Sequence, residues 1–155
     1  MAATGTETVA ASLLVRTIAP EDAGQLAELC AQLGYEVSAE AVSQRICRLA
    51  SCGDDHVALV ACMGTEVVGW IEAELTHHLQ SPVHALITGL VVRDGIRSVG
   101  VGKQLSAEVE TWARSNGIAI LRVTSRMTRE RAHRFYLREG FTQVKASAVF
   151  EKVLL

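Results

Sequence analysis

The sequence lacks a dominant charge, a long apolar run and a basic leader. Its formal net charge is −2, which gives no reason to expect binding to nucleic acid. No apolar run approaches the ~18 residues of a membrane span, and the small, polar start of the chain has no basic region typical of a secretory signal. We therefore expect neither a nucleic-acid nor a membrane partner, and a disordered N-terminus over residues 1–12.

The sequence also lacks any Cys-x-x-Cys pair, which removes the usual sign of a zinc or redox motif. Its four cysteines are Cys30, Cys47, Cys52 and Cys62. Three of them, at positions 30, 47 and 62, fall within apolar-periodic runs, where a free cysteine commonly behaves as a small buried hydrophobe. This pattern favours buried thiols in a reducing, cytoplasmic setting.

Apolar periodicity predicts one mixed α/β domain over residues 13–155, because a hydrophobic content of 49% is enough for a single core. The expected order is β-α-α-β-β-β-α-β-α-β, with room for one more strand at the end. Strands are expected at 13–18, 56–62, 67–75, 83–92 and 118–124, and the final one or two at 141–144 and 148–154. Helices are expected between Pro20 and Gly34, between the cap residue Ser38 and Gly53, and over 101–114 and 129–139.

A glycine-rich turn, Arg97-Ser98-Val99-Gly100-Val101-Gly102, joins an expected strand to an expected helix. Such a turn presents unpaired N–H groups and the positive end of the helix dipole to an anion, and glycines let the anion approach the main chain. The spacing departs from a Walker P-loop, since Val101 follows Gly100, and from a dinucleotide fingerprint, since Leu105 stands where a third small residue is needed. The turn is either a pyrophosphate cradle or a simple chain reversal, and its flanking elements favour the cradle.

Two segments resemble the signatures of one family. The segment from Leu90 to Gly102 resembles the acyl-coenzyme A signature of the GNAT acetyltransferase superfamily, and Ala132 to Phe141 resembles its second signature. The resemblance runs from about Leu14 to the C-terminus. It implies a central mixed, mostly antiparallel sheet flanked by helices, with strands four and five splayed around acyl-CoA. It further implies acetyl-CoA as co-substrate, no metal, and acetyl transfer to a primary amine by direct attack in a ternary complex.

The resemblance also implies which residues serve the cofactor. The main chain of Leu90, Val91 and Val92 would pair with the pantetheine arm and the thioester oxygen. The pyrophosphate would be held by the turn and the start of the following helix, that is, by Arg97, Ser98, Val99, Gly100, Val101, Gly102 and Lys103. The sequence departs from the family at Asp94, where members often have proline, and at Arg129, where many have an asparagine that touches the cofactor, so that role is not assigned to Arg129.

Tyr136 is the candidate acid that protonates the departing thiolate. Tyrosine has an ordinary pKa of about 10 and holds a proton near neutrality, and the resemblance places the matching tyrosine close to the coenzyme A sulfur. The alternative is that Tyr136 is a core aromatic of an amphipathic helix, as we expect of Phe135. The arginines that share this region are expected on a solvated face, although one could contact the 3′-phosphate of coenzyme A; they are Arg126, Arg129, Arg131, Arg134 and Arg138.

The candidate base is Glu72 or Glu74. Strand alternation places both carboxylates on the face that carries Trp70, where they could attract a cationic amine and relay its proton through water. The alternative is a solvated sheet edge with two ordinary charges. His84 is the other candidate, because the ordinary pKa of histidine, near 6.5, suits proton relay. Its neighbours at positions 77 and 78 are read as part of a surface loop rather than a metal site.

These residues leave two functional classes open. The first is an acetyltransferase acting on an aminoglycoside or other aminosugar, a polyamine, an amino acid or a protein amine. The second is an inactive acyl-CoA-binding regulatory module, against which the retention of Tyr136 argues. The loop at 75–83 and the region at 35–52 are expected to shape the acceptor site. Because dimers are common in the family, the resemblance also implies a homodimer.

Overall fold

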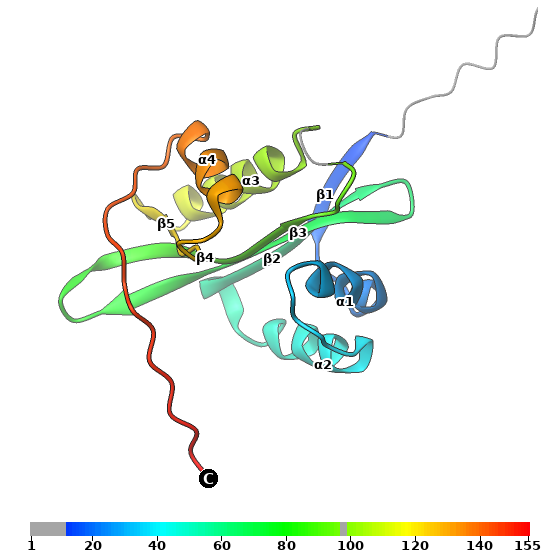
Figure 1. Cartoon of the computed structure of the whole chain (residues 1–155), viewed down its shortest axis with the longest axis horizontal. Coiled ribbons are helices and arrows are strands. Elements are labelled where there is room, and N and C mark those ends of the chain that lie inside the picture. Colours follow the sequence, from blue (N-terminus) through cyan, green and yellow to red (C-terminus); the bar gives the residue numbers. More distant parts are fainter. Residues whose placement is uncertain (1–11, 97–98) are drawn as a thin grey trace, which may run out of the picture. The chain divides into compact units, whose positions relative to one another are not determined.

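The computed structural model describes residues 12–96 and 99–155 (Figure 1). The chain forms two compact units, one ending at Val123 and the other spanning Thr124–Leu155. The N-terminus that the sequence predicts to be disordered lies, apart from residue 12, outside the described residues. Two residues of the predicted cradle, Arg97 and Ser98, lie outside them as well.

The first unit is built on a five-stranded sheet whose strands lie in sequence order (Figure 1). β1 (Leu13–Thr17), β2 (His56–Met63), β3 (Glu66–His78) and β4 (Ser81–Val92) pair antiparallel with their neighbours, and β5 (Leu121–Val123) pairs parallel with β4. The predicted mixed, mostly antiparallel sheet is therefore confirmed.

Helices cover both faces of this sheet (Figure 1). A short 3-10 helix (Pro20–Asp22) leads into α1 (Ala23–Gln32), and α2 (Ala39–Leu49) follows; both pack on one face, while α3 (Val101–Ser115) lies on the other. The predicted cap of α2 is confirmed, because the Ser38 hydroxyl accepts a hydrogen bond of 3.1 Å from the Ala41 N–H. The largest fully buried side chains include Leu29, Ile71 and Leu105, so helices and sheet share a core.

The predicted loop at 75–83 is wrong, because β3 and β4 continue through it. β3 runs to His78 and β4 begins at Ser81, which leaves a two-residue turn at Leu79 and Gln80. The rings of His78 and His84 stack across the hairpin with their centroids 5.8 Å apart. Cross-strand ring contacts of this kind extend a hairpin beyond its apolar alternation.

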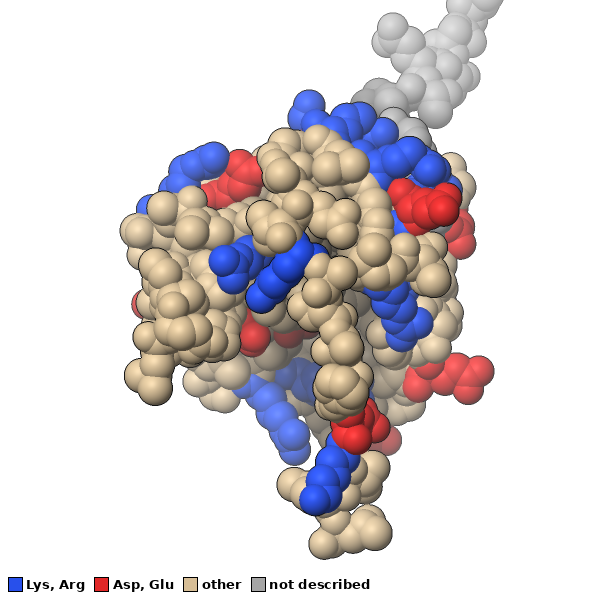
Figure 2. All heavy atoms as spheres, turned by 60° about the vertical axis from the view of Figure 1, so that its left-hand side comes forward, with Lys and Arg blue, Asp and Glu red and all other residues tan. Residues whose placement is uncertain are grey.

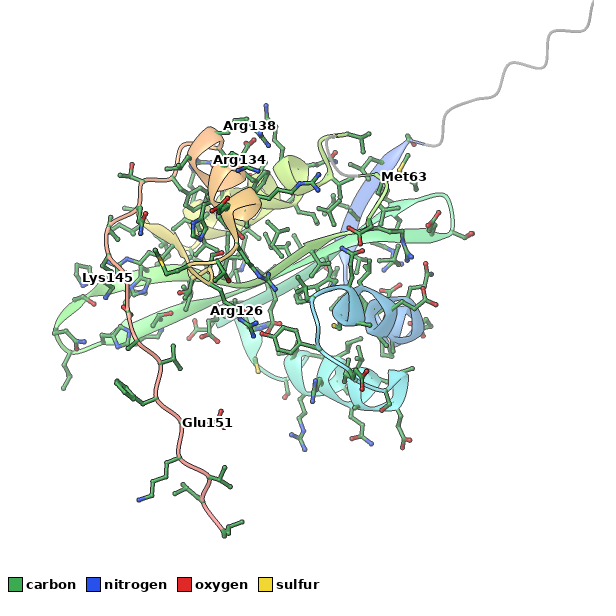
Figure 3. All side chains as sticks on the ribbon, viewed as in Figure 1. Met63, Arg126, Arg134, Arg138, Lys145 and Glu151 are labelled. Atoms are coloured by element: carbon green, nitrogen blue, oxygen red, sulfur yellow. The ribbon has the colours of Figure 1, made fainter. Side chains whose placement is uncertain are left out.

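The second unit contains α4 (Glu130–Arg138) and an extended C-terminal segment. The strands predicted at 141–144 and 148–154 are wrong, since none of the described residues after α4 pairs as a strand. Figure 3 shows Lys145 and Glu151 along this extended trace. A strand needs a neighbour for its backbone groups, so local β-propensity alone does not form one. The large apolar side chains of the C-terminal segment are exposed: Val144, Val149, Phe150, Val153, Leu154 and Leu155.

The four cysteines are all free thiols, in different environments. Cys62 is buried, as predicted, and Cys30 is half-buried. Cys47 is exposed, so its predicted burial is wrong; it lies beside the buried Ile46 and therefore points away from the core face of α2. Burial is the main cause that raises the pKa of the Cys30 thiol.

Candidate active site

The side of β4 that faces β5 is open along half its length. β4 pairs with β5 only through Ala85, Ile87 and the residue between them, whereas its pairing with β3 reaches Val92. Among the described residues, no strand pairs with β4 beyond Ile87 on the β5 side. The expected divergence of strands four and five is thus present in the pairing.

A β-bulge lies at the point where this opening begins. Glu72 is opposite Gly89 and Ala73 is opposite Ile87, so Thr88 is an extra residue on β4. The Thr88 hydroxyl donates to the Glu72 carbonyl at 3.3 Å. A bulge bends its strand and changes the direction of its backbone groups. Here only Gly89 separates the bulged Thr88 from the three residues expected to bind the pantetheine arm.

The end of β4 is held by a side chain from α1. The Gln32 side chain donates to the Val92 carbonyl at 2.8 Å and accepts from the Asp94 N–H at 2.7 Å. Asp94 is one of the two departures from the family pattern, and a proline there could not donate this second bond. Gln32 was missed by sequence reasoning, because its partners lie about sixty residues further along the chain.

The described part of the glycine-rich turn, the expected pyrophosphate cradle, opens directly into a helix, as the sequence predicts. Gly100 is the N-cap of α3 and has φ +87°, so α3 begins directly after it. A Cβ on Gly100 would meet no protein atom within 4 Å, so the left-handed backbone is a second reason for glycine here, beside the expected close approach of an anion. Val101 and Gly102 are buried, while Val99 and Lys103 are exposed.

Glu72 and Glu74 differ in their surroundings, although both lie on the Trp70 face of β3. The Glu72 carboxylate lies 2.9 Å from the His56 ring, measured from Oε1 to Nε2. Glu74 is exposed, and no hydrogen bond or ion pair joins its carboxylate to a described side chain. This face is the one covered by α1 and α2, because Trp70 packs on a cluster that includes Leu29, Ile46 and Val60. Of the two carboxylates, Glu72 is therefore the one held by a neighbouring side chain.

Trp70 lies against the strand expected to bind the cofactor. A Cβ on Gly89 would be only 2.5 Å from Cη2 of the Trp70 indole, so the ring lies directly over this glycine. The indole N–H is buried and has no hydrogen-bond partner in the described structure. Sequence reasoning assigned no role to Gly89, although a glycine inside a strand is a known sign of a bulge or a close approach.

His84 does not share the surroundings of Glu72. It is 4% exposed, its Nδ1 is 3.4 Å from the Pro82 carbonyl, and it is opposite Thr76 on β3. Thr76 is four residues along the strand from Glu72, which corresponds to roughly 13 Å. Among the described residues, no group of three His, Cys, Asp or Glu side chains is placed to hold a metal ion.

Tyr136 lies within an aromatic cluster of the second unit. Its ring makes edge-to-face contacts with Phe135 and Phe141, at centroid distances of 5.4 and 5.5 Å. Burial raises the pKa of the Tyr136 phenol, and the positive charge of Arg129 lowers it by a smaller amount. The phenol is therefore protonated near neutrality, as a general acid must be.

The arginines of this unit are mostly solvated, as the sequence predicts. Figure 3 shows Arg134 and Arg138 on α4, and both are exposed. The Arg138 guanidinium lies 5.9 Å from the centroid of the Phe135 ring. Arg129, at the N-cap of α4, is half-buried.

Comparison with known proteins identifies the family. The model of the acetyltransferase (GNAT) family matches residues 24–141. The chain belongs to the GNAT acetyltransferase family. It is an acetyl-CoA-dependent acetyltransferase, with coenzyme A carrying the acetyl group. The family expected from the two signature segments is confirmed.

Two named relatives act on different amines. An aminoalkylphosphonate N-acetyltransferase of Salmonella typhimurium is 39% identical over 88 residues, which is 54% of this chain but only 55% of that protein. An aminoglycoside N(6')-acetyltransferase of Stenotrophomonas maltophilia is 27% identical over 151 residues, which is 94% of this chain and 97% of that protein.

Solved structures show the same fold. An aminoglycoside antibiotic 6'-N-acetyltransferase from Acinetobacter baumannii has a TM-score of 0.80 at 17% identity, covering 92% of this chain and 99% of that chain. A transcriptional regulator from Bacillus halodurans has a TM-score of 0.81 at 21% identity, covering 91% of this chain and 100% of that chain. In the described part of the chain, no helix is long and apolar enough to cross a membrane.

Proposed function

We propose that the enzyme transfers the acetyl group by direct attack of a primary amine on the thioester in a ternary complex. The open side of β4, beside a carboxylate paired with histidine, is the observation that carries this proposal. The amine nitrogen bonds to the carbonyl carbon and the carbon–sulfur bond breaks. Glu72 takes the proton that the amine loses, and Tyr136 protonates the thiolate.

The cofactor roles follow the signature segment. In this proposal the main chain of Leu90, Val91 and Val92 pairs with the pantetheine arm and the thioester oxygen. The N-terminus of α3 supplies the positive end of a helix dipole to the pyrophosphate. The residues around that end are the proposed pyrophosphate site: Arg97, Ser98, Val99, Gly100, Val101, Gly102 and Lys103.

The acceptor in this proposal is a polycationic amine of the aminoglycoside class. Glu72 and Glu74 place two carboxylates on one strand face, which favours a cation and repels the anionic group of an aminoalkylphosphonate. Figure 2 shows Lys and Arg mixed with Asp and Glu over one face of the molecule, so the attraction arises from these local carboxylates rather than from a field of one sign. The relative that matches nearly the whole chain acts on an aminoglycoside.

Thiol release from acetyl-CoA tests the proposal across aminoglycosides, polyamines, amino acids, peptide amines and an aminoalkylphosphonate. We expect turnover with an aminoglycoside and a fall in kcat/KM for Glu72→Gln that shrinks as rising pH supplies free amine. Glu74→Gln should have the smaller effect. If both variants and the double variant keep the wild-type pH–rate profile, these carboxylates are surface charges and His84 is the next candidate. Acetyl-CoA binding without thiol release for any amine would favour the regulatory module.

We also propose that the protein is a homodimer and that it is located in the cytoplasm. The exposed apolar side chains after α4, including Phe150 and Leu154, favour burial against a second copy. Deletion of residues 142–155 should then convert a dimer into a monomer by light scattering, and a dimer that survives the deletion would contradict this assignment. The exposed free thiols Cys47 and Cys52 favour a reducing compartment.

A further inference from the structure

His56 begins β2 and is held firmly in place. Its side chain is 9% exposed, and its Nε2 lies 2.9 Å from Glu72 Oε1. The Cα partner of His56 is Glu74, whereas Glu72 is opposite Ala58. The ring therefore reaches diagonally across the sheet face to Glu72, a distance that long side chains span, and the small Ala58 leaves room for it.

The Glu72 carboxylate needs such a partner if it is to act on a bound amine. Its side chain is 31% exposed, and a glutamate free to rotate loses rotamer entropy when it is fixed in one geometry. A donor on a neighbouring strand fixes one carboxylate oxygen and leaves the other free to accept a proton. Catalytic groups held this way avoid the loss in rate that misplacement causes.

A second histidine–carboxylate pair in the same unit provides a contrast. His77 Nε2 lies 3.4 Å from Asp55 Oδ2, and these side chains are 60% and 63% exposed. Exposed pairs of this kind contribute little to stability or orientation. The His56–Glu72 pair is shorter and better buried, and it lies on the Trp70 face of β3.

We propose that His56 is a positioning residue for acetyl transfer, a role that rests on the proposed function. Its Nε2–H donates to Glu72 Oε1 and orients the carboxylate, so that Oε2 receives the proton lost by the attacking amine. His56 itself neither gains nor loses a proton in this step. The bond from β2 holds the carboxylate at a fixed place on the sheet face.

Three variants separate this role from simple packing. His56→Ala removes the donor, His56→Gln restores an N–H at about the position of the imidazole Nε2, and His77→Ala removes the exposed histidine as a control. We expect His56→Ala to lower kcat by roughly 10- to 100-fold while the Kd for acetyl-CoA stays unchanged. His56→Gln should recover most of the lost turnover, and His77→Ala should match the wild type.

His56→Ala that is folded by circular dichroism but fully active would overturn the proposal, and so would His56→Gln that is as impaired as His56→Ala. A readout independent of turnover is the ¹⁵N resonance of the His56 ring, which should change in Glu72→Gln and not in Glu74→Gln; an unchanged resonance would also overturn it. If Glu72→Gln lowers turnover and His56→Ala does not, only this inference fails. If Glu72→Gln leaves turnover intact, the base assignment of the proposed function fails.

Discussion

The sheet unit, up to Val123, and the C-terminal unit, Thr124–Leu155, differ in what they bury. Among the described residues of the first, several large side chains are less than 2% exposed, including Ile71, Ile87 and Leu105. The second has no buried residue at all, and its last fourteen residues are all exposed. With no side chain fully buried, the second unit gains less from the hydrophobic effect than the first.

This difference divides the proposed chemistry between the units. The open strand β4, the start of α3 and the His56–Glu72 pair belong to the unit with its own core. Tyr136, the proposed acid, belongs to the unit without a fully buried residue. We therefore expect substitutions in the first unit to change stability, cofactor binding or the removal of the amine proton, and substitutions in the second to change turnover with little effect on stability.

The largest expected effect on stability comes from a buried leucine of the first unit, compared with an exposed leucine of the second. Leu105 on α3 is 0% exposed and Leu137 on α4 is 59% exposed. Leu105→Ala should lower the free energy of unfolding by about 2–5 kcal/mol because it leaves a cavity. Leu137→Ala should stay within about 0.5 kcal/mol of the wild type. Urea unfolding of both variants measures this difference. Equal losses in the free energy of unfolding would contradict the difference in burial between the two units.

A smaller effect is expected from the buried charge of the sheet unit. The Asp22 carboxylate accepts two bonds of 2.8 Å from Arg16 and one of 2.8 Å from the Ala19 N–H. The bond from Arg16 is the main cause that holds the pKa of Asp22 below its ordinary value. This stabilisation is present above the unfolded pKa, about 3.9, and is lost as pH falls through the lower folded pKa.

Asp22→Asn should therefore lower the free energy of unfolding by about 1–2 kcal/mol at pH 7. This range allows for solvent screening at the half-exposed Arg16. It should also flatten the decline in stability below about pH 4. Glu151→Gln, in the exposed C-terminal segment, is the matched control and should leave the pH dependence unchanged. A wild-type decline that Asp22→Asn does not alter would show that other carboxylates cause it.

The smallest expected effect on stability comes from the two ends of α3. Gly100 and Gly117 have φ +87° and +73°, and a Cβ on either would meet nothing within 4 Å. Alanine at each should therefore cost a similar ~1 kcal/mol of backbone strain. Only Gly100→Ala should also weaken coenzyme A binding, by about tenfold or ~1.4 kcal/mol. Calorimetry that finds equal affinity in the two folded variants would remove Gly100 from the phosphate site.

Local signals in the sequence were enough to predict much of the sheet unit. The cap at Ser38, the short connection between the strands predicted at 56–62 and 67–75, and the start of α3 after Gly100 each depend on neighbours within a few residues. Each is where the sequence predicts it. The bond from Gln32 to Asp94 and the pairing of His56 with Glu72 join distant parts of the chain, so no local pattern could indicate them.

The predicted C-terminal strands show the other kind of error, in which a local pattern predicts an element that does not form. Residues 148–154 have the apolar and β-branched composition of a strand, yet they lie exposed and unpaired with any described residue. Composition measures how well a segment fits a sheet and does not supply the neighbouring strand. The family resemblance predicts the cofactor segment, and that assignment stays a prediction. The proposed choice of Glu72 over Glu74 depends on the hydrogen bond to His56, which the sequence does not indicate.

The proposal that Tyr136 of the second unit acts as the acid is tested most directly by Tyr136→Phe. This substitution keeps the ring and removes only the hydroxyl. Steady-state turnover and acetyl-CoA affinity are measured on the same folded protein, with single-turnover kinetics to isolate the chemical step. We expect the rate of that step to fall by about 10²–10⁴-fold while the Kd for acetyl-CoA stays within experimental error. A variant that keeps the wild-type single-turnover rate would contradict the account, because Tyr136 would then contribute only to the packing against Phe135 and Phe141.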